Sequence, residues 1–369
     1  MQNIIIVTIY DISNYGNRLQ NLATTILLEG MGFEVVTIDY VDRDYYSWKS
    51  RIKRVFHSMT NYKFTKDANY YMYQLPRELN NEKTDKRNIK KIYISNVSDI
   101  PEADYYLLGS DQVWNPTWYE DYKIKKDLFF LTFADPDKRA FFAPSFGVEQ
   151  IPIEWESFFS NGFKQFNQLS VREDSGAEII RNLTGKEAFV MLDPTLMVNA
   201  DTWREFEQKP KWIENNPYIV TYFLGGLTEK INELINDLNA ERQHEVYHLM
   251  EKVNREVYAS NYLEFIYLID HADLVLTDSF HACVFSFLFN KPFVVFDRAG
   301  NLPNMNSRID TLLTTFSLER KHFNRELQNE LYEHDYEEGY IVLERKRRES
   351  YDFLKDSLTV DVENESGGL

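Results

Sequence analysis

Short apolar runs alternate along the chain with longer amphipathic stretches. The first run, Ile4–Ile9, is almost entirely apolar, as expected of a strand buried on both faces of a parallel sheet. A turn-rich loop follows it, then a helix predicted over about Arg18–Glu29 and a second strand predicted over Glu34–Asp39. Strand, helix and strand in this order form a βαβ unit, the building block of a doubly wound fold.

Two series of such units follow one another, separated near residues 199–216. In the first series, further strands are predicted at Tyr105–Leu108, Arg139–Phe142, Gln168–Val171 and Phe189–Leu192. In the second, strands are predicted at Tyr218–Phe223, Glu245–His248, Leu274–Thr277 and Phe293–Phe296, with helices around Glu229–Asn239, Leu263–His271 and Phe280–Phe289. This pattern predicts an α/β fold of two Rossmann-like domains facing a cleft. We expect an N-terminal domain over residues 1–200, a C-terminal domain over 201–340, and a helix with a frayed tail over 341–369.

Composition narrows the class of protein. The 369 residues carry 41 Lys and Arg against 58 Asp and Glu, a net charge of −17, which disfavours a general nucleic-acid binder. Hydrophobic residues at 43% and charged residues at 27% are typical of a globular chain. The single Cys283 excludes an internal disulfide framework and suits a reducing compartment. With no signal-peptide pattern and no long apolar run, we expect a soluble, cytoplasmic protein.

Polar residues gather where predicted strands end, which is where open α/β folds bind ligands. The loop Asn14–Gln20 offers backbone N–H groups around Gly16 that could hold an anion, or it is a turn with Asn17 as the helix N-cap. The segment Gly109–Asn115 follows another apolar strand, and it either binds a ligand or closes a structural loop.

Charged groups follow two further strands. Arg172 offers a guanidinium fork suited to phosphate or carboxylate, or it pairs with a neighbouring acid such as Glu173. A helix predicted to begin at Asp278 or Ser279 places His281 in its first turn, beside free amide donors. His281 is then either an acid–base group or a structural residue.

Two further histidines match the amino-acid pattern of a metal-binding motif. His244-Glu245-Val246-Tyr247-His248 has the spacing of the zinc-protease motif, whose chemistry requires a helix. The segment is predicted to be a strand, so we expect no metal site.

Together, these segments resemble the polysaccharide pyruvyl transferase family. The resemblance rests on Asn14–Gln20, Gly109–Asn115, Ser170–Glu173, Leu192–Leu196, Thr277–His281 and Asn290–Phe293. It implies a fold similar to the GT-B glycosyltransferases, phosphoenolpyruvate as the donor, and a sugar of a surface or capsular polysaccharide precursor as the acceptor. Phosphoenolpyruvate is a co-substrate, and no cofactor or nucleic acid is expected.

The resemblance also assigns roles to residues. It implies His281 as the catalytic residue and Arg172, Asp278 and Ser279 as donor-binding residues. Many members carry Arg-Leu-His where this chain has Ser279-Phe280-His281, and Arg308 is our candidate for the missing positive charge. The residues expected at the acceptor or cleft are Asn14, Gly16, Asn17, Arg18, Gln20, Gly109, Ser110, Asp111, Gln112 and Trp114.

Two alternative functions fit the same sequence. One is a GT-B-type glycosyltransferase that uses a nucleotide sugar, because a fold does not determine its chemistry. The other is a non-catalytic glycan-binding protein of a polysaccharide cluster.

A basic insertion, at about residues 41–96, yields a prediction about membranes. It holds 13 Lys and Arg against 6 Asp and Glu, and apolar residues recur at helical spacing over Trp48–Met59. This stripe either packs on the domain or lies on an anionic membrane that carries a lipid-linked acceptor, which would make the protein peripheral at the inner face.

In vesicle flotation, the membrane hypothesis predicts binding to anionic vesicles only. Equal binding to neutral vesicles, or no binding, contradicts it.

Overall fold

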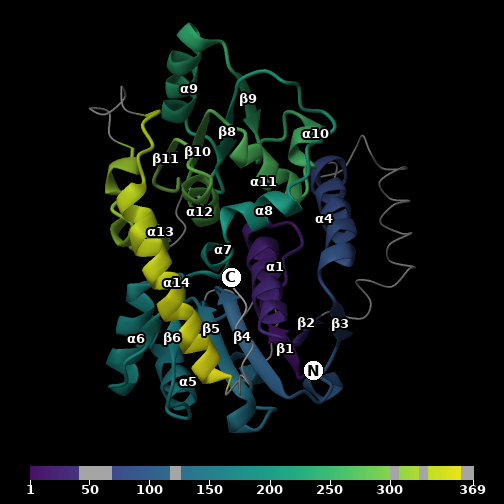
Figure 1. The fold of residues 1–369 in the computed structure, drawn as a ribbon, viewed down its shortest axis with the longest axis vertical. Coiled ribbons are helices and arrows are strands. Elements are labelled where there is room, and N and C mark those ends of the chain that lie inside the picture. Colours follow the sequence, from purple (N-terminus) through teal and green to yellow (C-terminus); the bar gives the residue numbers. More distant parts are fainter. Residues whose placement is uncertain (41–68, 117–125, 300–306, 324–330, 359–369) are drawn as a thin grey trace.

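Two parallel β-sheets organise the chain (Figure 1). The structure is a computed structural model that describes residues 1–40, 69–116, 126–299, 307–323 and 331–358. The first sheet has the order β3-β2-β1-β4-β5, with β1 Asn3–Val7, β2 Glu34–Tyr40, β3 Lys91–Ile94, β4 Tyr105–Asp111 and β5 Arg139–Pro144. Beside it lies a short parallel pair, β6 Ser170–Val171 and β7 Phe189–Val190. The second sheet has the order β11-β10-β8-β9, with β8 Tyr218–Tyr222, β9 Glu245–His248, β10 Leu274–Thr277 and β11 Phe293–Val295.

Helices cover these sheets and connect them. In the first half of the chain they are α1 Tyr15–Gly30, α4 Leu75–Asn88, α5 Ile153–Phe163, α6 Asp174–Thr184, α7 Pro194–Met197 and α8 Ala200–Phe206. In the second half they are α9 Glu229–Arg242, α10 Arg255–Tyr258, α11 Tyr262–Asp270, α12 Phe280–Leu288, α13 Ser307–Thr315 and α14 Glu337–Ser357. Among the described residues, no helix is both long and apolar enough to cross a membrane.

The predicted fold class is confirmed, because each sheet is parallel and its strands alternate with helices. β1, β8 and β10 are buried over nearly their whole length, as two-sided coverage by helices requires. The segment with the zinc-protease spacing also lies on a strand as predicted, β9. Its two histidines have different neighbours, since His248 Nδ1 lies 2.8 Å from Thr221 Oγ1 and His244 Nε2 lies 3.0 Å from Asp273.

Other details of the prediction were wrong. The first helix begins at Tyr15 rather than Arg18, and Asn14, not Asn17, is its N-cap, because the Asn14 side chain accepts a hydrogen bond from the Asn17 backbone at 3.2 Å. Each strand of the short pair β6 and β7 has only 2 residues, half the length expected. The predicted amphipathic helix over Trp48–Met59 lies outside the described residues.

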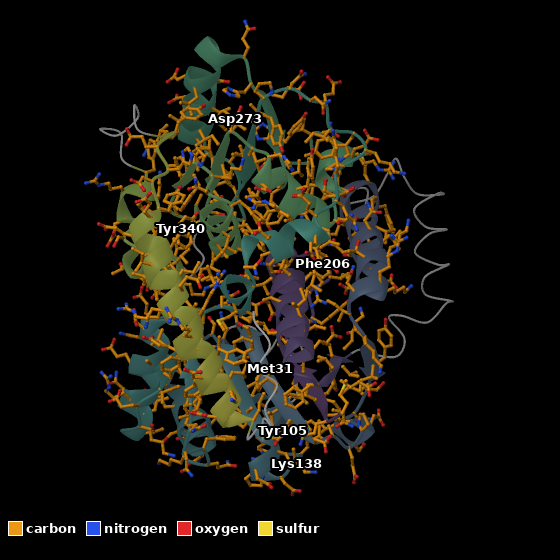
Figure 2. The ribbon with its side chains drawn as sticks, in the orientation of Figure 1. Met31, Tyr105, Lys138, Phe206, Asp273 and Tyr340 are labelled. Atoms are coloured by element: carbon orange, nitrogen blue, oxygen red, sulfur yellow. The ribbon has the colours of Figure 1, made fainter. Side chains whose placement is uncertain are left out.

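One hydrophobic core joins the two sheets. It includes Ile6 and Leu107 of the first sheet together with Val220 and Val275 of the second. The last helix, α14, returns along the molecule to β5 of the first sheet (yellow in Figure 1). Beside it, Phe353 of α14 stacks on Phe189 of β7 with 4.9 Å between ring centroids. The side chains in Figure 2 fill the space between these layers.

Helix α4, which lies in the basic insertion, is fastened to the second sheet by Arg77. This side chain is 1% exposed and donates hydrogen bonds to the carbonyl oxygens of Leu249 and, at 2.7 Å, Tyr258. Its guanidinium also lies 4.7 Å from the ring centroid of Tyr15 on α1. Arg77 therefore connects α1, α4 and the C-terminal half of the chain.

Replacement of Arg77 by methionine tests this connection. Arg77→Met keeps an apolar stem but leaves two buried carbonyls unpaired, so we expect the free energy of unfolding to fall by about 1–3 kcal/mol. The control is Arg87→Met on the exposed side of the same helix, expected within about 0.5 kcal/mol of wild type. Urea unfolding measures both, and equal effects would contradict the assignment.

Candidate active site

Buried charged side chains meet between the two sheets. Asp111 ends β4, Arg172 directly follows β6, and Asp193 directly precedes α7. Arg172 Nη1 donates to Asp193 Oδ2 at 2.6 Å, and Arg172 Nη2 lies 3.5 Å from Asp111 Oδ1. Asn17, in the first turn of α1, donates from Nδ2 to the other oxygen of Asp111 at 2.7 Å. Side chains from the end of β4 and from the starts of α1 and α7 thus fix the Arg172 guanidinium.

His281 reaches this group from the second half of the chain. It lies in the first turn of α12, is 7% exposed, and its Nε2 is 3.7 Å from Asp193 Oδ2. Its ring rests on α1 at Gly16, where a Cβ atom would lie only 2.0 Å from His281 Nδ1. The absence of a side chain at Gly16 is therefore what allows the imidazole to occupy this position.

Arg308, on α13, is a second buried cation at the same place. With its amide oxygen turned toward Arg308, Gln112 accepts hydrogen bonds from Nη1 at 3.0 Å and Nη2 at 2.6 Å. Burial, followed by the positive charge of Arg172, lowers the pKa of Arg308 to about 10. Two buried guanidinium groups that repel each other are stabilised by an anion placed between them.

Three nitrogen atoms at this site have no hydrogen-bond partner among the described residues: Arg172 Nε, Arg308 Nε and His281 Nε2. All three are buried, where an unmade hydrogen bond costs about 1–3 kcal/mol. Arg172, Asp193 and Arg308 also line a single cavity, together with the Phe280 ring. Cationic donors without partners beside a cavity favour an anionic ligand.

The carboxylates here stay ionised. Burial alone would raise the pKa of Asp193, but Arg172 and His281 outweigh burial and hold this pKa well below its usual range. Asp111 follows the same pattern, since Arg172 and His281 lower its pKa against the effect of burial. The described part of the site holds two fixed anions and two fixed cations around one imidazole.

Sequence analysis expected a larger set of residues at the cleft, and the structure brings only part of it together. The residues that meet here are Gly16, Asn17, Asp111, Gln112, Arg172, His281 and Arg308. Ser279 is the N-cap residue of α12, but its side chain makes no capping hydrogen bond. Asn14 caps α1, as described above.

Other expected cleft residues stabilise the first domain instead. Arg18 is fully buried and pairs with Asp85 at 3.2 Å. Gln20 accepts from the backbone of Ser110 at 3.2 Å, and Ser110 Oγ donates to the Ala143 carbonyl at 2.8 Å. Arg18 thus joins α1 to α4, whereas Gln20 and Ser110 join α1, β4 and β5. A role of these three residues in the cleft stays a prediction.

Three more expected residues are also engaged elsewhere. Trp114 is fully buried and donates from Nε1 to the Phe129 carbonyl at 3.0 Å. A Cβ at Gly109 would lie 2.2 Å from a backbone oxygen of the neighbouring strand β5, so this glycine serves strand packing. The carboxylate of Asp278 accepts from the backbone N–H groups of Leu224 at 2.7 Å and Gly225 at 2.8 Å. Asp278 therefore holds the loop after β8, and its contacts do not support the predicted donor binding.

Sequence reasoning did not single out Asp193 as a site residue. An aspartate before proline and threonine is a common helix start, and Asp193 Oδ1 does accept from the Thr195 backbone at 2.9 Å. Only the tertiary structure shows that its second oxygen contacts Arg172 and lies close to His281.

Comparison with known families decides the class of this chain. A family model described as polysaccharide pyruvyl transferase matches residues 14–300. The chain belongs to this family. The match with the pyruvyl transferase family includes Asn17, Asp111, Arg172, Asp193 and His281, whereas Arg308 lies beyond it. A search of the curated proteins found no match.

Solved structures are also similar to this member of the pyruvyl transferase family, at low sequence identity. UDP-GlcNAc 2-epimerase from Methanocaldococcus jannaschii is 12% identical, with 94% of this chain and 99% of that chain covered at a TM-score of 0.47. UGT89C1 from Arabidopsis thaliana, complexed with UDP-L-rhamnose, is 10% identical, with 97% and 99% covered at a TM-score of 0.46. MurG from Acinetobacter baumannii is 10% identical, with 96% and 100% covered at a TM-score of 0.42. Similarity at this level carries no argument about substrate.

Two glycines of α1 provide a matched test of the His281 position. Gly16→Ala places a methyl group against the ring, so we expect a loss of about 1–3 kcal/mol in stability as His281 is displaced. Gly30→Ala, at the other end of the helix, meets nothing within 4 Å, and we expect it to be neutral or to stabilise by up to about 1 kcal/mol. Thermal unfolding compares the two, and a Gly16→Ala melting temperature equal to that of Gly30→Ala would refute this packing.

Proposed function

We propose that this protein transfers pyruvate from phosphoenolpyruvate to a sugar of a surface polysaccharide precursor, forming a cyclic pyruvate ketal. Membership of the pyruvyl transferase family supports the class of reaction. The observation that supports the donor is the set of three buried nitrogens without partners, Arg172 Nε, Arg308 Nε and His281 Nε2.

The chemistry of phosphoenolpyruvate suits these nitrogens. The molecule carries a phosphate and a carboxylate on one small carbon skeleton, so it needs at least two fixed cations. Arg172 and Arg308 supply them, and guanidinium groups bind both kinds of anion through paired N–H donors. The cavity lined by both arginines and Phe280 offers the skeleton an apolar wall beside these charges.

The reaction balances without an oxidant or a metal. The methylene carbon of phosphoenolpyruvate takes up a proton, a sugar hydroxyl adds at C2, and a second hydroxyl then displaces phosphate from C2. Of the two hydroxyl protons, one ends on the new methyl group and the other on the released phosphate. His281 is the group proposed to move protons in these steps, since its Nε2 lies 3.7 Å from Asp193, which lines the donor cavity, and makes no hydrogen bond within the described residues.

The proposed acceptor is a sugar or a lipid-linked oligosaccharide of a capsule or exopolysaccharide precursor. A sugar that offers two neighbouring hydroxyl groups satisfies the ketal chemistry. We place the reaction in the cytoplasm, where a free thiol such as the buried Cys283 persists in its reduced form. Contact with the membrane face is proposed for the basic insertion only.

The decisive experiment is mass spectrometry of lipid-linked or nucleotide-linked sugars incubated with the protein and phosphoenolpyruvate. We expect one acceptor to gain the mass of one pyruvate minus water, with release of one phosphate. UDP- and GDP-sugars, offered alone as donors, serve as the control. Transfer of a sugar residue from them, without consumption of phosphoenolpyruvate, would favour the glycosyltransferase alternative.

Site variants separate donor binding from proton transfer. His281→Gln keeps a hydrogen-bonding side chain but cannot act as an acid, so we expect near-normal phosphoenolpyruvate binding and turnover reduced by roughly 10²–10⁴-fold. Arg308→Met removes a cation and is expected to weaken binding of phosphoenolpyruvate more than tenfold. Arg172→Lys keeps the charge without the paired donors, and is expected to weaken it similarly.

Calorimetric titration with phosphoenolpyruvate and a pyruvylation assay measure the two properties for each variant. The control is Arg181→Gln on α6, which breaks an exposed ion pair with Glu187 and should change neither phosphoenolpyruvate binding nor turnover. Wild-type turnover in His281→Gln would show that His281 is a structural residue.

A further inference from the structure

Asp193 divides its two carboxylate oxygens between different tasks. Oδ1 accepts from the Thr195 backbone at 2.9 Å and from Thr195 Oγ1 at 2.5 Å. Oδ2 accepts from Arg172 Nη1 at 2.6 Å and lies 3.7 Å from His281 Nε2. Because Thr195 fixes one oxygen, the other has a defined position relative to both Arg172 and His281.

The carboxylate of Asp193 is buried and stays ionised. Asp193 is 1% exposed, so no bulk solvent screens its charge. Arg172 and His281 hold the pKa of Asp193 well below its usual range despite burial, so the group remains an anion at any pH near neutrality. A fixed, permanent negative charge therefore stands between the proposed donor cation and the proposed proton carrier.

We propose that Asp193 is the positioning residue of the site: it holds Arg172 in place for the donor and orients the His281 ring beside it. This inference rests on the proposed function. Asp193 does not itself exchange a proton with the substrate. It acts through the two residues that flank its Oδ2 atom.

The difference between the two distances supports this division. The 2.6 Å contact is a strong charge-assisted hydrogen bond, which immobilises the guanidinium. The separation of 3.7 Å is too long for a hydrogen bond, so the carboxylate attracts the imidazole without occupying its Nε2 atom. Nε2 is thereby oriented, and it keeps its hydrogen-bonding capacity unused among the described residues.

Among the described residues, Asp193 is the carboxylate that comes within ion-pair distance of the imidazole. Gly16 of α1 contacts the Nδ1 edge and carries no charge, and Phe280 of α12 meets the ring at an interplanar angle of 88°. Asp111 is a second acid on which the charge of His281 acts, and Arg172 pairs with both acids.

Asp193→Asn tests the proposal because asparagine has the same shape and still accepts from Thr195, but carries no charge. We expect turnover to fall about 100-fold and binding of phosphoenolpyruvate to weaken about tenfold, because the uncharged amide loses the charge-assisted hydrogen bond that fixes Arg172. Thr195→Val removes the hydroxyl hydrogen bond to Oδ1 but keeps the charge of Asp193 and the backbone hydrogen bond that holds it. It is the matched control and should retain turnover within about threefold.

A second measurement needs neither donor nor acceptor. The ring signals of His281 in the nuclear magnetic resonance spectrum are identified by their loss in His281→Gln. In Asp193→Asn we expect these signals to shift, because the side chain beside the ring has lost its charge, and in Thr195→Val to stay in place. If wild type neither binds nor consumes phosphoenolpyruvate, the proposed function fails, while these signals still test whether Asp193 controls His281.

Asp193→Glu covers the case in which the asparagine variant does not fold. It keeps the anion but moves it by one methylene group, so we expect retained binding of phosphoenolpyruvate and lost turnover. Unchanged His281 signals in Asp193→Asn, or a loss of turnover in Thr195→Val as large as in Asp193→Asn, would overturn the proposal.

Discussion

The pairing of buried Arg172 with Asp193 and Asp111 is the interaction on which the rest of the site depends. A guanidinium removed from water is tolerated only where anions and acceptors replace its hydration, and loss of one partner of such a pair costs about 3–5 kcal/mol. The replacement extends well beyond this pair. Asp111 accepts from Asn17, Asn17 accepts from Arg18, and Arg18 pairs with Asp85 on α4. A continuous series of buried polar side chains therefore extends from α4 through α1 to the end of β4 and reaches the proposed donor cavity.

The same set of contacts shows what several polar residues of the family-like motifs bind within the protein. Arg18, Gln20 and Ser110 are polar and follow strand ends, so sequence patterns suggest ligand binding. In the structure Arg18 connects α1 to α4, and Gln20 and Ser110 connect α1 to β4 and β5 through buried hydrogen bonds. A buried Arg needs such partners as much as a ligand does, and periodicity cannot distinguish the two cases.

Strands and helices were the most predictable part of the molecule. Runs such as Ile4–Val7 and Leu274–Thr277 are apolar on both faces, so their burial follows directly from their composition. Arg172 and His281 could be selected because each follows a strand end, where parallel sheets converge. Asp193 also follows a predicted strand, but its contacts with Arg172 and His281 depend on which loops come together in the fold, as does the close fit of Gly16 against His281. Local sequence patterns do not indicate which loops come together in the fold.

The contact between Gly16 and His281 has a mechanical consequence. Gly16 belongs to the first helix of the N-terminal half and His281 to a helix of the second sheet, and the two halves share one hydrophobic core. A sliding or rotation of one half against the other changes the gap at this contact directly, because no flexible side chain lies between the backbone and the ring. The spacing of the two halves therefore determines where the imidazole lies. A shift of one half against the other at this contact therefore also moves the imidazole of His281.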